Sequence, residues 1–187
     1  MNHHFPTRTI YTVNPQLPKL ILDEMLKQCM ELTYMSSLTE GKTTPTDRRS
    51  SQQCWLPWDS WIAGILHNNM ISANNDYFHY DLDHFDSAIQ VTKYEPGQEY
   101  NWHVDQLHKE ELMPRKLSIS LLLNEDFTGG EFQLLDPNSR FNETPITVPL
   151  SAGSIAIFPS WVVHRVKPVT SGTRYSLVAW MNGPQFR

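Results

Sequence analysis

Apolar side chains that recur every three or four residues predict two helices in the first part of the chain. The first stripe consists of Leu22, Met25, Leu26 and Cys29. The second stripe consists of Trp58, Trp61, Ile62 and Ile65. Prolines stand near the start of each pattern, where a first helical turn tolerates them. Because an amphipathic helix buries its apolar face, we expect both helices to pack against a core.

The segment between these helices, Ser36–Gln53, shows no hydrophobic period. It is rich in Ser, Thr and charged residues and contains Arg48 and Arg49. This composition predicts a solvated loop. A loop of this length in a compact domain can also cover a substrate, which is the functional alternative.

From about residue 76 the hydrophobic period changes from that of a helix to that of a strand. Between residues 117 and 123, aliphatic positions alternate with Ser118 and Ser120, which predicts a strand with one apolar face. The pair Gly129-Gly130 then marks a turn. Further short runs, separated by turn residues, are Glu131–Leu135, Ile146–Leu150, Gly153–Phe158, Val162–Val166 and Arg174–Met181. This spacing predicts an all-β sandwich or barrel supported by two helices.

Length and composition favour one compact domain. The chain has 187 residues, of which 40% are hydrophobic and 19% are charged, which is enough to bury a core. We expect a single domain over residues 1–187. In this division, residues 1–75 form mostly helical support and a loop, and residues 76–187 form the β core.

Charge and cysteine content exclude several classes of protein. A net charge of -5 disfavours a broad electrostatic contact with nucleic acid. Two cysteines, Cys29 and Cys54, cannot form a disulfide framework or a thiolate zinc site. No apolar run reaches membrane-spanning length, and the N-terminus lacks the pattern of a signal peptide. We therefore expect a cytoplasmic protein with no membrane partner, whose metal ligands, if any, are nitrogen and oxygen atoms.

Three His-x-Asp pairs are candidates for such ligands. A two-histidine, one-carboxylate metal site needs one such pair and one distant histidine. In an extended segment, residues i and i+2 point to the same face, so His-x-Asp can offer two ligands at once. The pairs are His79-Tyr80-Asp81, His84-Phe85-Asp86 and His103-Val104-Asp105.

Sequence context selects the third pair. His103 and Asp105 lie inside the β region, and an isolated His164 follows after several predicted strands. This order is how a jelly roll brings a distant histidine beside a first pair of ligands. The other two pairs precede the barrel, in an acidic and aromatic stretch, and are expected to be surface or edge-strand residues.

The last predicted strand carries a candidate anion anchor. On a period of two, one face of this strand holds Arg174, Ser176, Val178 and Trp180. A guanidinium on that face offers a planar fork for a carboxylate. Six residues of strand span about 20 Å, so Arg174 and Trp180 are expected at opposite ends of one pocket.

At this point the sequence resembles the Fe(II)- and 2-oxoglutarate-dependent oxygenases, in particular the prolyl 4-hydroxylase-like branch with its bacterial and viral relatives. The resemblance covers residues 90–187 and follows the order of several motifs. The matching motifs are Tyr94-x-x-Gly97-x-x-Tyr100-x-x-His103-x-Asp105, Arg115-x-x-Ser118, Gly129-Gly130-Glu131, Pro159-Ser160-x-x-x-His164, Pro168-Val169-Thr170-x-Gly172-x-Arg174 and Trp180.

The resemblance implies a mainly β fold with supporting helices, the double-stranded β-helix or cupin-like jelly roll. It implies that His103, Asp105 and His164 hold Fe(II). It also implies that Arg174 binds the distal carboxylate of 2-oxoglutarate, helped by the hydroxyl group of Tyr94. The matching residues on the substrate side are Tyr100, Arg115 and Trp180.

The same resemblance implies a reaction and its cofactors. Fe(II), 2-oxoglutarate and O2 would support hydroxylation of a C–H bond with release of succinate and CO2, and ascorbate is a candidate reductant. The substrate that the resemblance favours is a prolyl residue in a peptide or protein, followed by free proline or another small amino acid.

Two alternatives belong to other classes. A non-enzymatic, cupin-like metal-binding protein would keep the fold but would not need Arg174, Tyr94 and the three ligands together. A nucleic-acid demethylase of the AlkB type would share the cofactors, but its pattern has a second arginine where this chain has Trp180. The acidic net charge also disfavours nucleic acid as a partner.

Overall fold

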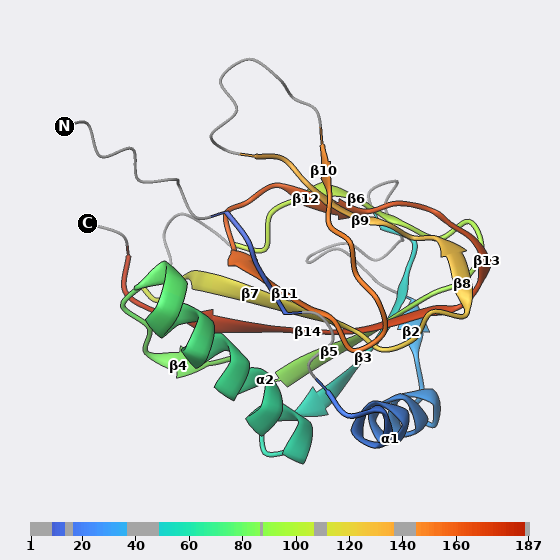
Figure 1. Ribbon diagram of the computed structural model, residues 1–187, viewed down its shortest axis with the longest axis horizontal. Helices are drawn as coiled ribbons and strands as arrows, with labels where there is room; N and C mark the ends of the chain where they lie inside the picture. The colour runs from blue at the N-terminus through green and yellow to red at the C-terminus, as the bar shows by residue number, and fades with distance from the viewer. Residues whose placement is uncertain are drawn as a thin grey trace.

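The computed structural model describes residues 9–13, 17–36, 49–86, 88–106, 112–136 and 145–185. These residues form a large sheet, a smaller sheet facing it, and helices that cover the outer face of the large sheet (Figure 1). This is the expected jelly-roll arrangement of mainly β structure with two supporting helices. No described helix combines the length and the apolar character that a bilayer span requires.

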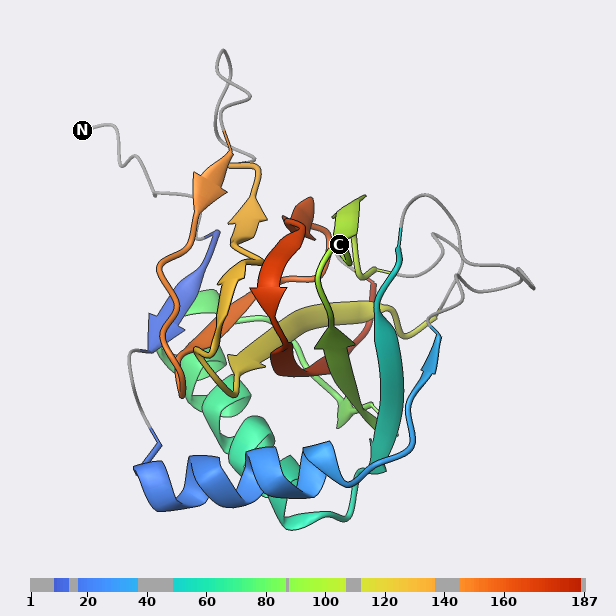
Figure 2. The ribbon, with the colours of Figure 1, turned by 90° about the vertical axis from the view of Figure 1, so that its right-hand side faces the viewer.

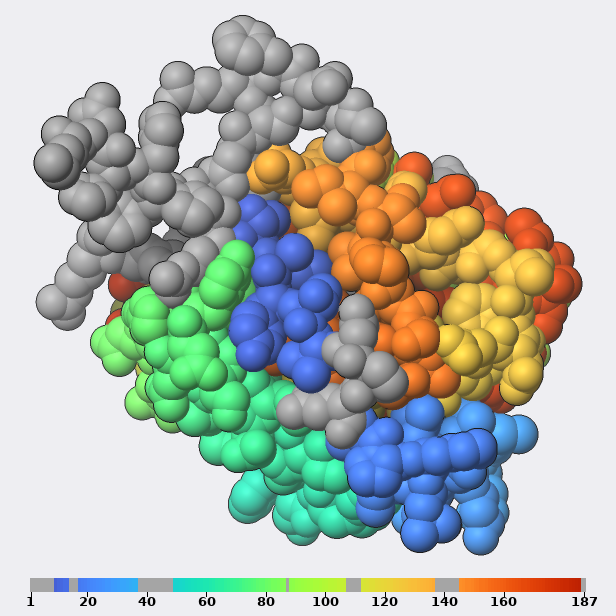
Figure 3. Space-filling model, viewed as in Figure 1, coloured from blue at the N-terminus to red at the C-terminus, as the bar shows by residue number. Residues whose placement is uncertain are grey.

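The large sheet is the scaffold of the molecule. Its strands, in spatial order, are β1 (Tyr11–Val13), β11 (Ile155–Pro159), β7 (Arg115–Leu122), β14 (Arg174–Asn182), β5 (Ala88–Tyr94), β3 (Gln52–Pro57) and β2 (Met35–Ser36), and β4 (His84–Phe85) pairs with β14. Strands β1, β2 and β3 come from the first 57 residues, so the core sheet is not confined to residues 76–187 as the period change predicted. In the space-filling view, β1 lies between the green region around residues 61–85 and the orange segment after residue 145 (Figure 3).

The small sheet lies above the large one and provides two of the candidate ligands. Its strands, in spatial order, are β10 (Ile146–Thr147), β9 (Phe132–Leu134), β12 (His164–Val166) and β6 (Tyr100–His103). A separate two-stranded ribbon joins β8 (Phe127–Gly129) and β13 (Val169–Gly172). The expected strands of this region are confirmed, although several are shorter than their apolar runs, because bulges and turns end the ladders early.

Two helices cover the outer face of the large sheet, on the side opposite the small sheet (Figure 2). Helix α1 (Lys19–Met30) buries Leu22, Met25 and Cys29, as its stripe predicted. Helix α2 (Trp61–Ala73) is followed by a π-helical turn, η1 (Asn74–Phe78).

The predicted stripe of the second helix is correct at Ile62, which is buried, and at Ile65, which packs against the core, but it is wrong at its two tryptophans. Trp58 precedes the helix and is 65% exposed, and Trp61 is 43% exposed. The buried face instead follows Ile62, Leu66 and Met70, at steps of four residues. The prediction failed because it counted two exposed indole side chains as core positions.

The predicted strand with one apolar face is buried on both faces. Along β7, Leu117, Ile119 and Leu121 pack into the core between sheet and helices. Ser118 and Ser120 point to the other face and are also buried, at 0% and 6% exposure. The polar side of this strand therefore faces the interior between the two sheets, where the candidate site lies.

Candidate metal and co-substrate site

The antiparallel register of the small sheet brings the two distant histidines together. His103 ends β6 and His164 begins β12, and these two residues are direct cross-strand partners. Their ring centroids lie 4.1 Å apart. Asp105 lies in the loop after β6, where its backbone N–H donates to the Ser160 carbonyl at 2.9 Å. The strand thus ends at His103, and a loop rather than the expected strand positions the carboxylate.

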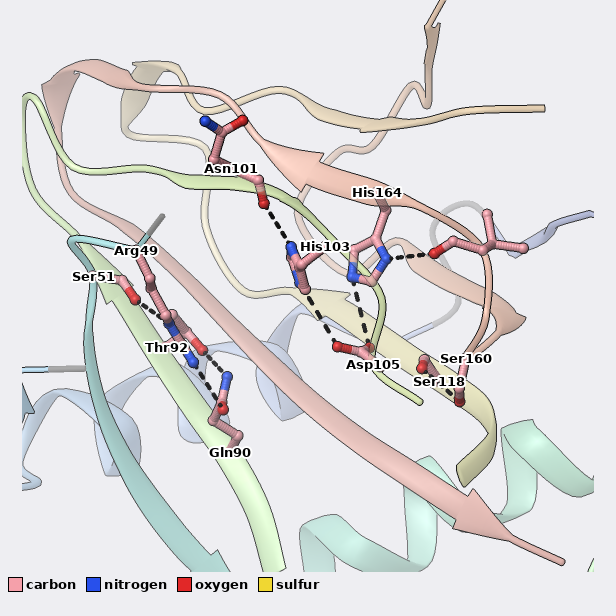
Figure 4. A network of polar contacts seen from close by, with 11 residues as sticks. Arg49, Ser51, Gln90, Thr92, Asn101, His103, Asp105, Ser118, Ser160 and His164 are labelled. Atoms are coloured by element: carbon pink, nitrogen blue, oxygen red, sulfur yellow. Dashed lines mark hydrogen bonds and ion pairs between the residues drawn. The ribbon is translucent and has the colours of Figure 1, made fainter. Parts of the chain in front are cut away.

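The carboxylate of Asp105 lies between the two imidazole rings (Figure 4). His103 Nε2 is 3.7 Å from Asp105 Oδ1, and His164 Nε2 is 3.6 Å from Asp105 Oδ2. One ligand atom of each residue lies within 4.8 Å of the others. Among the described residues, this is the group of histidine, cysteine and acidic side chains that can hold a metal ion.

Backbone hydrogen bonds orient both rings. The Nδ1 atom of His103 contacts the Asn101 carbonyl at 2.7 Å, and the Nδ1 atom of His164 contacts the Val162 carbonyl at 2.9 Å. A carbonyl only accepts, so each Nδ1 is the protonated nitrogen and each Nε2 keeps its lone pair toward Asp105. This is the tautomer that a metal ion requires.

Burial also sets the charge state of the cluster. Burial and the neighbouring His164 lower the pKa of His103 to about 3, so its ring is neutral at pH 7. Burial alone would raise the pKa of Asp105, but the imidazoles of His164 and His103 outweigh that effect and lower it. Two imidazole nitrogens and one carboxylate converge in a space of low exposure.

The cluster opens into a cavity of about 380 Å³ between the two sheets. This volume is in the range of small-molecule sites. The expected site residues on its wall are Tyr94, Tyr100, His103, Asp105, Arg115, His164 and Trp180. The bystander pairs lie elsewhere: His84 is exposed and contacts Asp83 at 2.8 Å, whereas Asp86 forms an ion pair with Arg115.

Arg174 lies directly behind this wall. Its side chain is 1% exposed, its Nη1 donates to Ser176 Oγ at 2.9 Å, and its guanidinium lies 5.6 Å from the ring centre of Tyr94. No carboxylate of the described residues lies within ion-pair distance of it, and its Nε has no hydrogen-bond partner. A buried guanidinium without an anion is an incomplete ion pair, because desolvation of a charge is costly unless a counter-charge compensates it.

These features match a known family. The family model described as the 2OG-Fe(II) oxygenase superfamily matches residues 89–182. The chain belongs to this superfamily. The match covers all strands that supply the metal cluster and Arg174, and it confirms the family that the sequence motifs indicated.

Curated relatives of this chain are PKHD-type hydroxylases. One from Synechococcus sp. (strain JA-3-3Ab) is 34% identical over 99 residues, which are 50% of this chain and 42% of the relative. One from Psychrobacter sp. is 39% identical over 95 residues, or 47% of this chain and 35% of the relative. In these alignments the chain therefore spans less than half the length of the relatives. A longer alignment, with a protein of Acaryochloris marina, covers 88% of this chain and 76% of the relative at 27% identity.

Solved structures share the fold of this chain. A prolyl-4-hydroxylase of Pseudomonas putida superposes with a TM-score of 0.73 at 21% identity, covering 96% of this chain and 95% of its own. A prolyl hydroxylase of Trichoplax adhaerens, solved with a peptide fragment of an oxygen degradation domain, has a TM-score of 0.78 at 18% identity. It covers 94% of this chain and 84% of its own.

The donor set of the oxygenase fits the Fe(II) and 2-oxoglutarate of the superfamily. Two imidazole nitrogens and one carboxylate oxygen form the facial arrangement of non-haem iron sites. Asp105 Oδ2 is buried and has no hydrogen-bond partner, which leaves a lone pair for a cation. The buried Nε of Arg174 has no hydrogen-bond partner, so its guanidinium can still pair with an anion such as a carboxylate.

The sequence motifs missed one wall of the oxygenase cavity. Arg49, Gln53, Trp55 and Gln90 also line it, from β3, its preceding segment and β5. Arg49 forms an isolated bridge with Tyr100 and is 7% exposed, and Gln52–Gln53 belong to β3, so the expected solvated loop ends before residue 49. Residues 37–48, including Arg48 and any substrate-covering role, lie outside the described residues. A signal for this strand was present in every second residue, namely Arg49, Ser51, Gln53 and Trp55. Because these side chains mix polar and apolar types, the series did not predict a strand.

Proposed function

We propose that the protein is an Fe(II)- and 2-oxoglutarate-dependent dioxygenase that hydroxylates a C–H bond of a prolyl residue in a peptide or protein. The observation that carries the proposal is the His103–Asp105–His164 cluster with the buried, unpaired Arg174 beside the same cavity. The named relatives are hydroxylases, and one solved neighbour holds a peptide. The prolyl substrate is itself part of the proposal, because the solved neighbours share 21% and 18% sequence identity with this chain.

We assign different roles to the residues at the metal cluster and to Arg174. His103, Asp105 and His164 would hold the iron, and a set of three protein ligands would leave further coordination positions open. Fe(II), when bound, supplies the activation of O2 that the chemistry requires. Arg174 would fix the distal carboxylate of 2-oxoglutarate, with Ser176 and Tyr94 orienting the guanidinium.

The net reaction is balanced by the co-substrate. One oxygen atom of O2 enters the new C–OH group, and the other enters succinate. 2-Oxoglutarate loses its C1 carboxylate as CO2 and, with the C–H bond, supplies the four electrons that reduce O2. The wall of buried aromatic side chains limits water, which protects this chemistry from unproductive turnover.

The substrate side of the cavity carries a guanidinium and two indole rings, and the planes of the two indole rings are tilted by 42°. The guanidinium of Arg115 lies 3.7 Å from the ring centre of Trp180, and the Trp180 ring centre lies 6.2 Å from that of Trp55. Arg115 is held from behind by Asp86, with Nη2 3.0 Å from Oδ2. Such a surface is suited to the flat, apolar face of a pyrrolidine ring.

Succinate release tests the proposal. The protein, loaded anaerobically with Fe(II), is exposed to O2 and 2-oxoglutarate with proline-rich peptides, free amino acids or methylated oligonucleotides. We expect stimulation of succinate release by a prolyl peptide and a mass increase of one oxygen atom in that peptide. Stimulation by the oligonucleotides alone, or turnover with none of the three classes, contradicts the prolyl assignment.

The co-substrate anchor has its own test. Arg174→Ala is expected to weaken 2-oxoglutarate binding to the Mn(II)-loaded protein by roughly ten- to a hundred-fold, because a charge-assisted pair is lost. Arg174→Lys retains the charge and is expected to lose less. Titration calorimetry measures both, and an equal loss of Mn(II) affinity in Arg174→Ala would show that Arg174 supports the metal site instead.

A further inference from the structure

The cavity holds a second buried guanidinium that the co-substrate does not require. We propose that Arg49 forms an anion subsite in the substrate half of the cavity and binds a carboxylate group of the substrate. This inference rests on the proposed function and narrows its substrate class. It adds a free carboxylate to the chemical features by which the protein selects its target.

The first argument is the incomplete pairing of Arg49. Its side chain is 7% exposed, its Nε donates to Ser51 Oγ at 2.8 Å, and its Nη1 donates to Gln90 Oε1 at 3.5 Å. Its Nη2 is buried without a hydrogen-bond partner. All these partners are neutral, and no carboxylate of the described residues lies within ion-pair distance. A desolvated cation in this state gains most from an incoming anion.

The second argument is the position of Arg49 relative to the metal cluster. Its guanidinium lies over the ring of Tyr100, 4.5 Å from the centroid, and that ring stacks on His103 with centroids 3.4 Å apart. A carboxylate bound by Arg49 would therefore lie one aromatic layer from the metal cluster. Figure 4 shows the Arg49–Ser51–Gln90–Thr92 cluster and the His103–Asp105–His164 cluster in the same close view.

The third argument separates Arg49 from the co-substrate. 2-Oxoglutarate has two carboxylates, of which one would meet Arg174 and the other the metal. The charges of both Arg49 and Arg174 act on the phenol of Tyr94, where they oppose the rise in its pKa that burial causes. Arg174 lies 5.6 Å from the ring centre of Tyr94, whereas Arg49 lies over Tyr100, so one co-substrate held by Arg174 and the metal leaves Arg49 without an anion.

The neighbours of Arg49 on the same strand face suit an amino-acid unit. Gln53 Oε1 is buried without a partner on the cavity wall, where it can accept a hydrogen bond from a substrate N–H. Trp55 follows two residues later and also lines the cavity. A guanidinium donor, an amide acceptor and an indole in succession fit a carboxylate, an N–H group and an apolar ring. The carboxylate can be a chain terminus or an acidic side chain next to the reactive residue.

Paired probes distinguish these sources. N-acetyl-L-proline is compared with N-acetyl-L-prolinamide, and N-acetyl-Pro-Asp-amide is compared with N-acetyl-Pro-Asn-amide. Each is titrated into protein loaded with Mn(II) and 2-oxoglutarate, and quenching of tryptophan fluorescence reports binding through Trp55 and Trp180. We expect the carboxylate member of one pair to bind at least about tenfold more tightly than its neutral counterpart.

Variants assign the preference to Arg49. Arg49→Gln is expected to abolish the preference, whereas Arg49→Lys keeps part of it. Lys93→Gln is the matched control, because this cation of β5 pairs with Glu95 and does not line the cavity. Since no carboxylate in the described part of the chain pairs with Arg49, Arg49→Gln is also expected to leave the melting temperature unchanged or to raise it.

Three results would overturn the proposal. The first is equal or absent binding of both members in both pairs. The second is a loss of 2-oxoglutarate affinity in Arg49→Gln as large as that in Arg174→Ala, which would place Arg49 in the co-substrate site. The third is a preference that survives in Arg49→Gln. Failure of the proposed function itself is separate, because it appears as an absence of 2-oxoglutarate binding in the wild type.

Discussion

Each histidine of the metal cluster is oriented by the backbone carbonyl two residues before it. His103 uses Asn101 and His164 uses Val162, with similar distances of 2.7 and 2.9 Å. The same local bond therefore occurs on two strands that pair in register. The ligands are held in position by the fold before any ion binds, so little reorganisation accompanies metal binding.

Removal of one ligand tests this cluster. His103→Ala and Asp105→Ala are each expected to abolish Mn(II) or Fe(II) binding, because two protein ligands remain in a site built for three. The controls are His79→Ala and His84→Ala, which remove the histidines of the other two His-x-Asp pairs and are expected to leave metal affinity nearly intact. Calorimetry of the metal alone measures this, and retained binding in His103→Ala would refute the ligand assignment.

The depressed pKa of His103 predicts a pH dependence of stability. Its folded pKa is about 3, whereas a histidine in an unfolded chain titrates near about 6.5. As the pH falls from about 6.5 toward 3, the unfolded chain takes up a proton that the folded chain does not, so stability falls. Metal-free protein is expected to lose melting temperature between about pH 7 and about pH 5. His103→Gln should flatten this dependence, and the exposed His84→Gln should not.

The ribbon of β8 and β13 leads the chain into the strand that carries Arg174. Gly172 ends β13 with φ 73°, and β14 begins two residues later. A Cβ atom at Gly172 would lie 2.1 Å from the Asp126 carbonyl oxygen, so a side chain there requires backbone movement. This element therefore fixes where the anion anchor enters the sheet.

Two glycine substitutions test that element. Gly172→Ala is expected to reduce the free energy of unfolding by roughly 1–3 kcal/mol, because of its clash and its positive φ. Gly64→Ala is the matched control in α2, where a Cβ would meet nothing within 4 Å. There alanine favours the helix by about 0.5–1 kcal/mol. Urea unfolding measures both, and effects of the same sign would contradict the assignment.

At the scale of the molecule, the helices stabilise the sheet and leave the other face of the sheet to the site. The apolar residues of α1, α2 and the outer face of β7 form one core cluster. A second cluster lies between the two sheets and includes Phe132, Phe158 and Tyr94 around the histidines. Under the proposed function, metal and co-substrate would bind inside the second cluster, and their binding energy would add to the stability of the whole domain.

Ligand-dependent stability follows from this arrangement. A ligand that binds only the folded state at about 100 times its Kd adds about 2.7 kcal/mol. Mn(II) alone is expected to raise the melting temperature, and Mn(II) with 2-oxoglutarate is expected to raise it further. Excess EDTA should reverse both shifts. A full 2-oxoglutarate shift in the presence of EDTA would show that the co-substrate binds without the metal.

The period-two strands and the ligand spacing made much of the fold and site predictable. His103, Asp105, His164 and Arg174 are separated by up to 71 residues, yet the structure brings the first three together, as their order predicted, and places Arg174 near Tyr94 of the cavity wall. Strand β7 was predicted from its alternation, although its serine face proved to be interior. The reason is that a wall of a polar cavity is buried without being apolar.

The N-terminal part was less predictable. Strand β3 reads Gln-Gln-Cys-Trp-Leu-Pro, which has no clear alternation of polar and apolar residues because its inner face lines the cavity. Arg49 is charged and follows a polar segment, so composition assigned it to solvent. Its burial depends on its bridge to Tyr100, a contact between residues that are distant in the sequence.

Under the proposed function, the two sheets would hold opposite ends of a bound co-substrate. The small sheet and its adjoining loop carry the metal ligands, whereas Arg174 belongs to β14 of the large sheet. Such a molecule would chelate the metal at one end and pair with Arg174 at the other. It would link the two sheets and resist their sliding against each other. In the proposed reaction, succinate lacks the 2-keto acid group that would chelate the metal. The link between the two sheets is therefore lost as the product forms. Turnover would then alternate between a rigid and a loosened sandwich, and the loosened form would favour product exit.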